Sequence, residues 1–398
     1  MLNFDEALAR ILEQVTTLGT ENIDIGNALN RVLAEPVFAR TDQPPFDGSA
    51  MDGYAVQSGD VHPGAVLMQI GESQAGAGFN GTLSPGQCIR IFTGAPLPEG
   101  ADAVVMQEVT SADGNQITFE KMVLPGQNVR PRGQDFSQGA ELATSGTALS
   151  PAHIALIAAG NVPEIEVFKR PAIGLLATGD ELKPPGSELT PGQIVGSNSF
   201  ALNALFSPFA SRILHLDNAP DSEEQLRALF QKALDGPADI IISTGGASVG
   251  DHDLVLPVLK SLGVTVDFWK IAMRPGKPVM FGRYENKLFF ALPGNPVSAY
   301  VTAITLVLPA IRAACGFASP SNKTLRLPLA APLSANGPRR HFMRCTIETG
   351  EGISSSVHPI LQTDSSHLSS LAAANGLLIV DENTQALQVG QLVEVILI

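Results

Sequence analysis

The chain has 398 residues, of which 44% are hydrophobic and 16% are charged. This length exceeds what one hydrophobic core usually organises, so we expect two to four domains. The composition excludes an intrinsically disordered protein. With 39 acidic and 25 basic residues the formal net charge is -14. Because such a chain repels polyphosphates at long range, nucleic acid is excluded as a partner.

The cysteines and the N-terminus indicate the compartment. Cys88, Cys315 and Cys345 are widely spaced, without a CxxC pair or a histidine in zinc-ligand register. The first residues contain no basic region followed by an apolar stretch, and no later segment holds about 18 uninterrupted apolar residues. We therefore expect a cytoplasmic protein in a reducing compartment, with no membrane partner.

The first 170 residues predict one helix followed by a β-rich region. Asn3 is an N-cap candidate, and apolar residues then recur at helical spacing as far as Val15. From about residue 36 to residue 150, short apolar runs alternate with Gly, Pro, Asn and Asp, which is typical of strands and tight turns. Ser150, Pro151 and Gly160 then mark the cap, first turn and end of a short helix.

The rest of the chain predicts a doubly wound, mainly parallel α/β sheet and then a small barrel-like β-domain. In 171–318 we expect strands at 172–177, 212–216, 240–243, 264–269 and 288–291, with helices starting near residues 199, 221, 251 and 296. From residue 319 onward, polar turns divide apolar segments at 325–329, 344–347, 376–380 and 392–398.

Three polar loops follow predicted strands, at the edge where ligands of open α/β sheets bind. In the second loop (243–253), glycines let backbone amides approach a phosphate and hydroxyls add donors. A tight turn with a helix cap explains only part of this composition, and neither a Walker A nor a dinucleotide pattern is present. For the first loop (178–181), an ordinary polar loop is as good an explanation as a ligand site. For the third loop (293–295), a rigid connection is as good an explanation.

Charged residues of both signs lie near these loops. Lys270, Arg274 and Lys277 place three cations within eight residues, which fits an anionic ligand better than it fits a solvated surface. Magnesium commonly takes one or two carboxylates together with substrate phosphates. Asp221 and Asp251 can equally be helix caps only. The candidate acids are Asp180, Glu181, Asp221, Asp251 and Asp253.

Three further motifs, at 43–56, 90–108 and 129–135, lie in the β-rich region. Tight turns alone would explain the two Asp-Gly pairs of the first motif. Taken in order, the motifs of the whole chain resemble those of the molybdopterin molybdenumtransferases, the family of MoeA proteins and gephyrin E-domains. The stretches that carry the resemblance are 45–56, 93–96, 130–135, 178–182, 245–251, 274–278 and 292–298.

The resemblance implies a homodimer of four-domain subunits. The domains would be 1–45 with 139–170, then 46–138, 171–318 and 319–398, the third being a molybdopterin-binding domain similar to the molybdopterin adenylyltransferases. The implied reaction converts adenylylated molybdopterin and molybdate into molybdenum cofactor and AMP, with Mg²⁺ as cofactor. A molybdopterin adenylyltransferase and molybdoenzyme delivery proteins are the further partners implied.

The resemblance also assigns roles to residues. Asp52 and Thr93 would face the α/β domain of the partner subunit, forming a catalytic set with Glu181 and Asp253. The metal candidates are Glu181, Asp251 and Asp253. The substrate-binding candidates are Thr178, Gly179, Asp180, Asp221, Ser243, Gly245, Gly246, Ser248, Gly250, Lys270, Arg274, Lys277, Pro293, Gly294, Asn295, Arg344 and Ser366.

Two other functions stay open at this point. Adenylylation of molybdopterin alone would account for residues 171–318, but it leaves the N-terminal motifs and the C-terminal β-domain unexplained. A non-catalytic scaffold would suit a gephyrin-like relative, although the sequence contains no disordered linker or fused domain.

Overall fold

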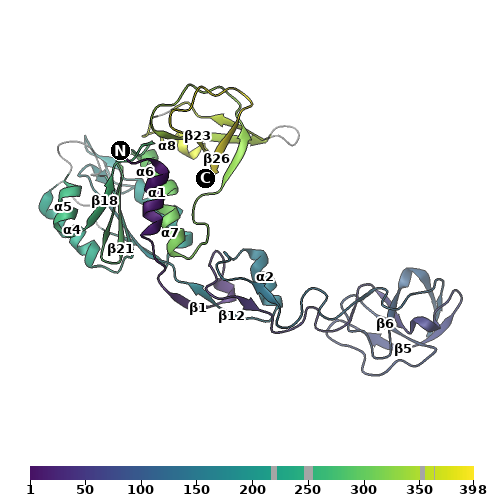
Figure 1. Cartoon of the computed structure of the whole chain (residues 1–398). Helices are drawn as coiled ribbons and strands as arrows, with labels where there is room; N and C mark the ends of the chain where they lie inside the picture. The colour runs from purple at the N-terminus through teal and green to yellow at the C-terminus, as the bar shows by residue number, and fades with distance from the viewer. Residues whose placement is uncertain (217–221, 246–253, 350–354, 363) are drawn as a thin grey trace. The chain divides into compact units, whose positions relative to one another are not determined.

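The computed structural model describes residues 1–216, 222–245, 254–349, 355–362 and 364–398 (Figure 1). By its internal contacts the chain divides into two units. The first unit comprises Met1–Glu21, Asn30–Ala34 and Val167–Ile398, and the second comprises Asn22–Leu29 and Glu35–Glu166. The four domains implied by the resemblance are a finer division, which stays a prediction.

A six-stranded sheet forms the centre of the first unit, in the order β16-β13-β17-β21-β20-β18. Only β20 runs antiparallel to its neighbours in this sheet, so the predicted mainly parallel α/β sheet is confirmed. The strands are β13 (Ala172–Ala177), β16 (Arg212–His215), β17 (Ile240–Thr244), β18 (Thr265–Trp269), β20 (Met280–Tyr284) and β21 (Lys287–Leu292).

Strand β20 was not among the predicted elements. Its five residues carry a glycine at Gly282, which weakens the strand pattern. The strand is defined by a tight hairpin to β21, in which Tyr284 pairs with Lys287 and Glu285 adopts a φ of 51°. Tertiary pairing therefore decides this strand.

Helices cover both faces of the sheet, as Figure 1 shows for α4 and α5 on one side and α1, α6 and α7 on the other. Because side chains alternate along a strand, Ile241 packs with the α4 and α5 cluster while Ile240 and Ile242 pack in the opposite cluster. The doubly wound prediction is thus confirmed. The helices are α1 (Phe4–Glu13), α3 (Asn198–Phe206), α4 (Glu223–Asp235), α5 (Val255–Ser261), α6 (Pro296–Thr302) and α7 (Leu308–Ala314).

Two helix starts can be compared with their predicted caps. The helix α2 (Pro151–Ala159) begins after Ser150 as expected, with a capping box completed by His153. The helix α4 begins two residues later than predicted, because Ser222 is its N-cap and its hydroxyl accepts from the Gln225 amide at 3.4 Å. The capping interpretation of Asp221 concerns a residue outside the described part of the chain.

The helical run Pro296–Ala314 contains α6, a π-helical turn at Ala303–Val307 and α7. Among the described residues it is the one helix long and apolar enough to cross a membrane. In its most apolar window 83% of the residues are buried inside the fold. Its composition therefore reflects a core position between the sheet and the rest of the first unit.

The C-terminal part of the first unit is a barrel-like β-domain, as predicted. Its strands follow the order β19-β23-β25-β26-β22, and β24 pairs with the edge of β23 opposite β25. The Ala330 amide donates to the Val357 carbonyl at 2.8 Å, which returns the end of β22 to β24. The strands are β19 (Met273–Arg274), β22 (Thr324–Pro328), β23 (Arg340–Thr349), β24 (Ser355–Pro359), β25 (Gly376–Val380) and β26 (Leu392–Leu397).

The second unit is β-rich, as predicted. Its main sheet has six strands in the order β7-β4-β6-β5-β9-β8. Tyr54, Cys88 and Phe119 are among the buried residues on one side of it, and Ile89 and Ile91 are among those on the other. The strands are β4 (Gly53–Val56), β5 (Val66–Ser73), β6 (Gln87–Ile91), β7 (Ala103–Met106), β8 (Thr110–Asp113) and β9 (Gln116–Phe119).

Candidate functional site

One row of paired residues crosses the α/β sheet near the carboxyl ends of its parallel strands. The row runs through Leu176, Ser243, Ala291, Met280 and Trp269, each of which is the Cα partner of the next. Because β20 alone is reversed, the segment between β18 and β20 also opens at this edge. The carboxyl edge therefore collects the first loop (178–181), the second loop (243–253), the third loop (293–295) and the cationic segment (270–278).

The first loop holds one carboxylate close against its own backbone. The buried Thr178 donates its amide to the Thr244 carbonyl at 2.9 Å. Gly179 has a φ of 137°, and a Cβ placed there would lie 2.4 Å from Oε2 of Glu181. This φ favours glycine, because residues with a Cβ rarely adopt it. The exposed Asp180 and Glu181 are thus presented at the carboxyl edge.

The second loop is described only as far as Gly245. This glycine has a φ of 88°, and a Cβ there would lie 2.5 Å from the Thr178 carbonyl oxygen, so the first two loops meet backbone to backbone. Ser243 is fully buried, and its hydroxyl has no hydrogen-bond partner within the described residues. It therefore belongs to the buried end of β17. Gly246, Ser248, Gly250, Asp251, Asp253 and Asp221 lie outside the described residues.

The third loop is held from two directions. The Gly294 carbonyl accepts from the Asn198 side-chain amide at 2.8 Å, at the start of α3. The Asn295 side-chain amide donates to the Ser365 hydroxyl at 2.8 Å, and Ser365 belongs to the C-terminal β-domain. Neither Asn198 nor Ser365 was predicted. Asn198 stands at a predicted helix start, whereas no pattern in the sequence distinguishes Ser365 from the serine that follows it.

The cationic segment carries backbone strain at Lys270. This residue has a φ of 92°, which is uncommon for a long side chain. Its amide donates to the Val279 carbonyl at 3.0 Å, and its ammonium lies 4.5 Å from the centre of the Trp269 ring. Strain of this kind persists only where the surrounding structure over-determines it, and it clusters at functional sites. Lys270 thus has a fixed position at the carboxyl edge.

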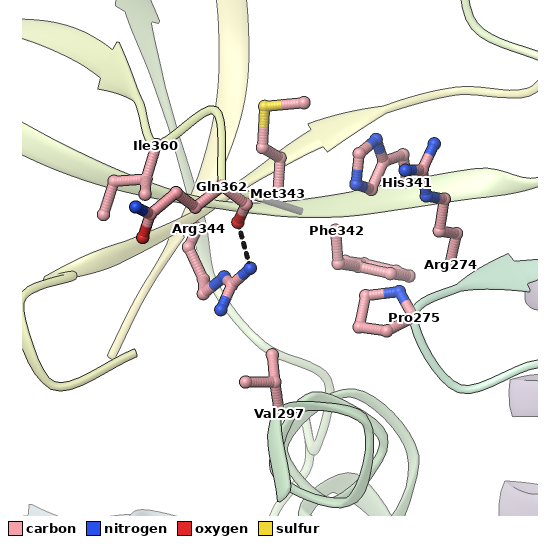
Figure 2. Close-up of a pocket in the computed structure, with 9 residues that line it drawn as sticks. All are labelled: Arg274, Pro275, Val297, His341, Phe342, Met343, Arg344, Ile360 and Gln362. Atoms are coloured by element: carbon pink, nitrogen blue, oxygen red, sulfur yellow. Dashed lines mark hydrogen bonds between the residues drawn. The ribbon is translucent and has the colours of Figure 1, made fainter. Parts of the chain in front are cut away.

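Arg274 lies in a small pocket between the cationic segment and the C-terminal β-domain. Figure 2 shows His341 beside Arg274, and the Arg344 guanidinium turned toward Gln362. The accessible volume of about 20 Å³ suits a single water molecule, not a pterin. Burial lowers the pKa of His341 to about 4, and the nearby charges of Arg274, Arg339 and Arg344 act in the same direction.

Arg344 and Ser366 both lie in hydrogen bonds that shape the segment 364–370. The buried Arg344 guanidinium donates to the carbonyls of Asp364 and His367, each at 3.1 Å, and to the Ser370 hydroxyl at 2.6 Å. The Ser366 amide and hydroxyl donate to Asp364 Oδ1, both at 2.8 Å. These two bonds lower the pKa of the Asp364 carboxyl. The binding roles suggested for Arg344 and Ser366 stay predictions.

In the second unit, the structure brings together Asp52 and Thr93, which are 41 residues apart. Asp52 Oδ1 accepts from the Thr93 amide at 2.8 Å and from its hydroxyl at 3.0 Å. These bonds, with the charge of Arg90, lower the pKa of the Asp52 carboxyl. Arg90 is itself fixed, since it donates to the Gly53 carbonyl at 2.9 Å. The result is an exposed, ionised carboxylate in a defined orientation.

The described residues hold no group of three or more His, Cys, Asp or Glu side chains that could bind a metal ion. Of the predicted metal ligands only Glu181 is described. A single exposed carboxylate at the carboxyl edge fits the way magnesium binds, through one or two carboxylates and the phosphates of a substrate.

The fold is that of a doubly wound α/β protein joined to two β-rich parts, with Gly-rich loops, cations and acids gathered at the carboxyl edge of its sheet. Three family models match the chain: the MoeA N-terminal region (domain I and II) over residues 2–160, a probable molybdopterin binding domain over 174–313, and the MoeA C-terminal region (domain IV) over 326–398.

Relatives are similar over most of the chain. The molybdopterin molybdenumtransferase of Haemophilus influenzae is 40% identical over 313 residues, covering 78% of this chain and 77% of that protein. That of Bacillus subtilis is 33% identical, covering 99% and 93%. A crystal structure of the molybdopterin biosynthesis moeA protein from Pyrococcus horikoshii matches with a TM-score of 0.84 at 28% identity, covering 100% of both chains. The chain belongs to the molybdopterin molybdenumtransferase family.

Replacing Lys270 by glycine should separate stability from activity. Glycine adopts the positive φ without strain, so the melting temperature of Lys270→Gly should be unchanged or slightly higher. The free energy of unfolding should rise by no more than about 1 kcal/mol. Activity should fall at least about tenfold, because a cation at the carboxyl edge is lost. Lys260→Gly, in the helix α5, is the control and should cost about 1 kcal/mol. Equal destabilisation of both proteins, measured by thermal unfolding, would contradict the strain argument.

His341 should make the first unit sensitive to acid. Its pKa in the folded protein, about 4, lies below its ordinary value of 6.5, so the unfolded chain binds more protons between these values and stability falls as the pH falls. Between about pH 7 and about pH 5 this should cost about 2 kcal/mol. Urea unfolding of His341→Gln should show a correspondingly smaller loss. The same pH dependence in both proteins would rule this role out.

Proposed function

We propose that this protein is an enzyme of molybdenum cofactor biosynthesis that inserts molybdenum from molybdate into adenylylated molybdopterin and releases AMP. One observation carries the proposal. Relatives named molybdopterin molybdenumtransferase match this chain across both the first and the second unit, and not only across the α/β sheet. The family resemblance supplies the identity of the substrates.

The carboxyl edge suits a polyanionic substrate. Lys270, Arg274 and Lys277 supply positive charge in a chain whose net charge is -14, so an anion is attracted locally although the whole protein repels it. At Gly245 the absence of a Cβ lets the first two loops meet backbone to backbone, and backbone amides of such glycine-containing loops can approach phosphate groups. Magnesium bound by Glu181 and substrate phosphates would neutralise charge on the leaving AMP.

Asp52 and Thr93 would act from the second unit of the partner subunit in a homodimer. The Asp52 carboxylate already accepts two hydrogen bonds from Thr93, so it stays ionised at neutral pH. It is therefore suited to orient a cation or a donor group of the substrate. A molybdopterin adenylyltransferase as supplier, delivery proteins as acceptors and a cytoplasmic location complete the proposal.

Two alternatives are less well supported. An adenylyltransferase-type activity would require the α/β sheet alone, yet family models also match residues 2–160 and 326–398. A scaffold without catalysis would need neither the strained Lys270 nor the pair of Asp52 and Thr93.

The deciding experiment supplies adenylylated molybdopterin, molybdate and magnesium to the purified protein and follows AMP release and molybdenum retention. Asp52→Ala, Glu181→Ala and Asp253→Ala should each lower turnover at least about tenfold, a loss of about 1.4 kcal/mol of transition-state stabilisation. Asp113→Ala and Glu188→Ala remove exposed acids elsewhere and are the matched controls. No AMP from the folded wild-type protein would overturn the proposed function.

A shared active site predicts complementation between inactive variants. When Asp52→Ala and Glu181→Ala chains are co-refolded, half of the dimers are mixed, and each mixed dimer holds one intact site and one doubly altered site. The mixture should regain about a quarter of wild-type turnover. A mixture as inactive as its components would show that both residues serve the same subunit's site.

A further inference from the structure

The C-terminal β-domain supplies the cap of the helix that follows the third loop. The first amides of a helix need external acceptors. Asn295 is the N-cap of α6 but makes no side-chain capping bond. The Val297 amide donates instead to the Ser365 backbone carbonyl at 3.0 Å, while the Asn295 side chain donates to the Ser365 hydroxyl at 2.8 Å. One serine thus binds both the loop and the helix start.

Ser365 is held firmly in turn. It lies between Asp364 and Ser366, and the Ser366 amide and hydroxyl both donate to Asp364 Oδ1. The buried Arg344 guanidinium binds the Asp364 and His367 carbonyls and the Ser370 hydroxyl. The segment 364–370 is therefore a rigid support whose contact with the α/β sheet at the third loop is Ser365.

The third loop also contacts the second loop and the start of α3, through Gly294. A Cβ on Gly294 would lie 3.5 Å from the Cα of Gly245. On its other side the Gly294 carbonyl is bound by Asn198. Asn198 of the α/β domain thus holds the Gly294 carbonyl, while Ser365 of the C-terminal β-domain holds the Asn295 side chain and the Val297 amide. A displacement of about 1 Å at such a position is enough to lower a catalytic rate strongly.

We infer that Ser365 is a positioning residue of the site. Its hydroxyl orients the Asn295 side-chain amide, and its backbone carbonyl fixes the start of α6. The third loop is thereby preorganised for the anionic substrate. The inference rests on the proposed function for its catalytic consequence. The C-terminal β-domain thereby acquires a role in the site, which is to position the third loop through Ser365.

The first test compares three serine variants. Ser365→Ala should raise KM and lower kcat/KM about tenfold, whereas Ser365→Thr keeps a hydroxyl and should retain most of the activity. Ser369→Ala removes an exposed serine of the same segment and is the matched control. The melting temperatures of Ser365→Ala and Ser369→Ala should agree. Equal kinetics of these two alanine variants would overturn the inference.

A double-mutant cycle with Asn295→Ala tests whether Ser365 acts through Asn295. If it does, Ser365→Ala should add little to the loss already caused by Asn295→Ala. Additive losses would show that Ser365 acts by another route, which overturns the inference.

Hydrogen exchange gives a readout independent of turnover. The Val297 amide should exchange faster in Ser365→Ala than in Ser369→Ala, because its acceptor segment is less firmly docked. Unchanged exchange would refute the positioning role even in an active enzyme. Faster exchange in Ser365→Ala, together with no AMP release from the folded wild-type protein, would instead refute the proposed function and leave the positioning role standing.

Discussion

The rest of the site depends on the pairing of β17 with its two parallel neighbours. Ser243 and Thr244 pair with Leu176 and Ala177 on one side and with Ala291 and Leu292 on the other. This register aligns the ends of three buried strands, so that three loops spread over residues 178–295 start at the same edge of the sheet. A slip of one residue would turn each side chain to the opposite face and separate the loops.

The reversed strand β20 extends the same edge to the cationic segment. By returning the chain between β18 and β21 it places Lys270 level with the parallel strand ends, and it leaves Met273 and Arg274 free to pair with Arg340 and His341 of the C-terminal β-domain. The cationic segment is thus attached to the C-terminal β-domain at Arg274. The strained backbone of Lys270 can persist because the chain is fixed on both sides of it: Trp269 pairs with β20, and Met273 and Arg274 pair with β23.

Much of the fold follows from patterns that the sequence displays directly. Alternating strands and helices, the Ser150 cap and the glycine-rich ends of apolar strands all arise from local preferences, and each matches the structure. Local patterns fail where long-range contacts decide. Strand β20 is defined by its partner, and Ser243 was expected in the loop but lies buried in β17. The pair of Asp52 and Thr93 is joined by hydrogen bonds that span 41 residues.

The sequence by itself determined the α/β and β organisation, the loops and cations at strand ends, and the family resemblance, because periodicity and motifs are properties of residues near one another along the chain. Only the tertiary structure decided which of these residues meet. Ser365 shows the difference. Nothing local distinguishes it from Ser366, yet the docking of the C-terminal β-domain places its hydroxyl 2.8 Å from Asn295, because contacts between distant segments are set by packing and not by sequence distance.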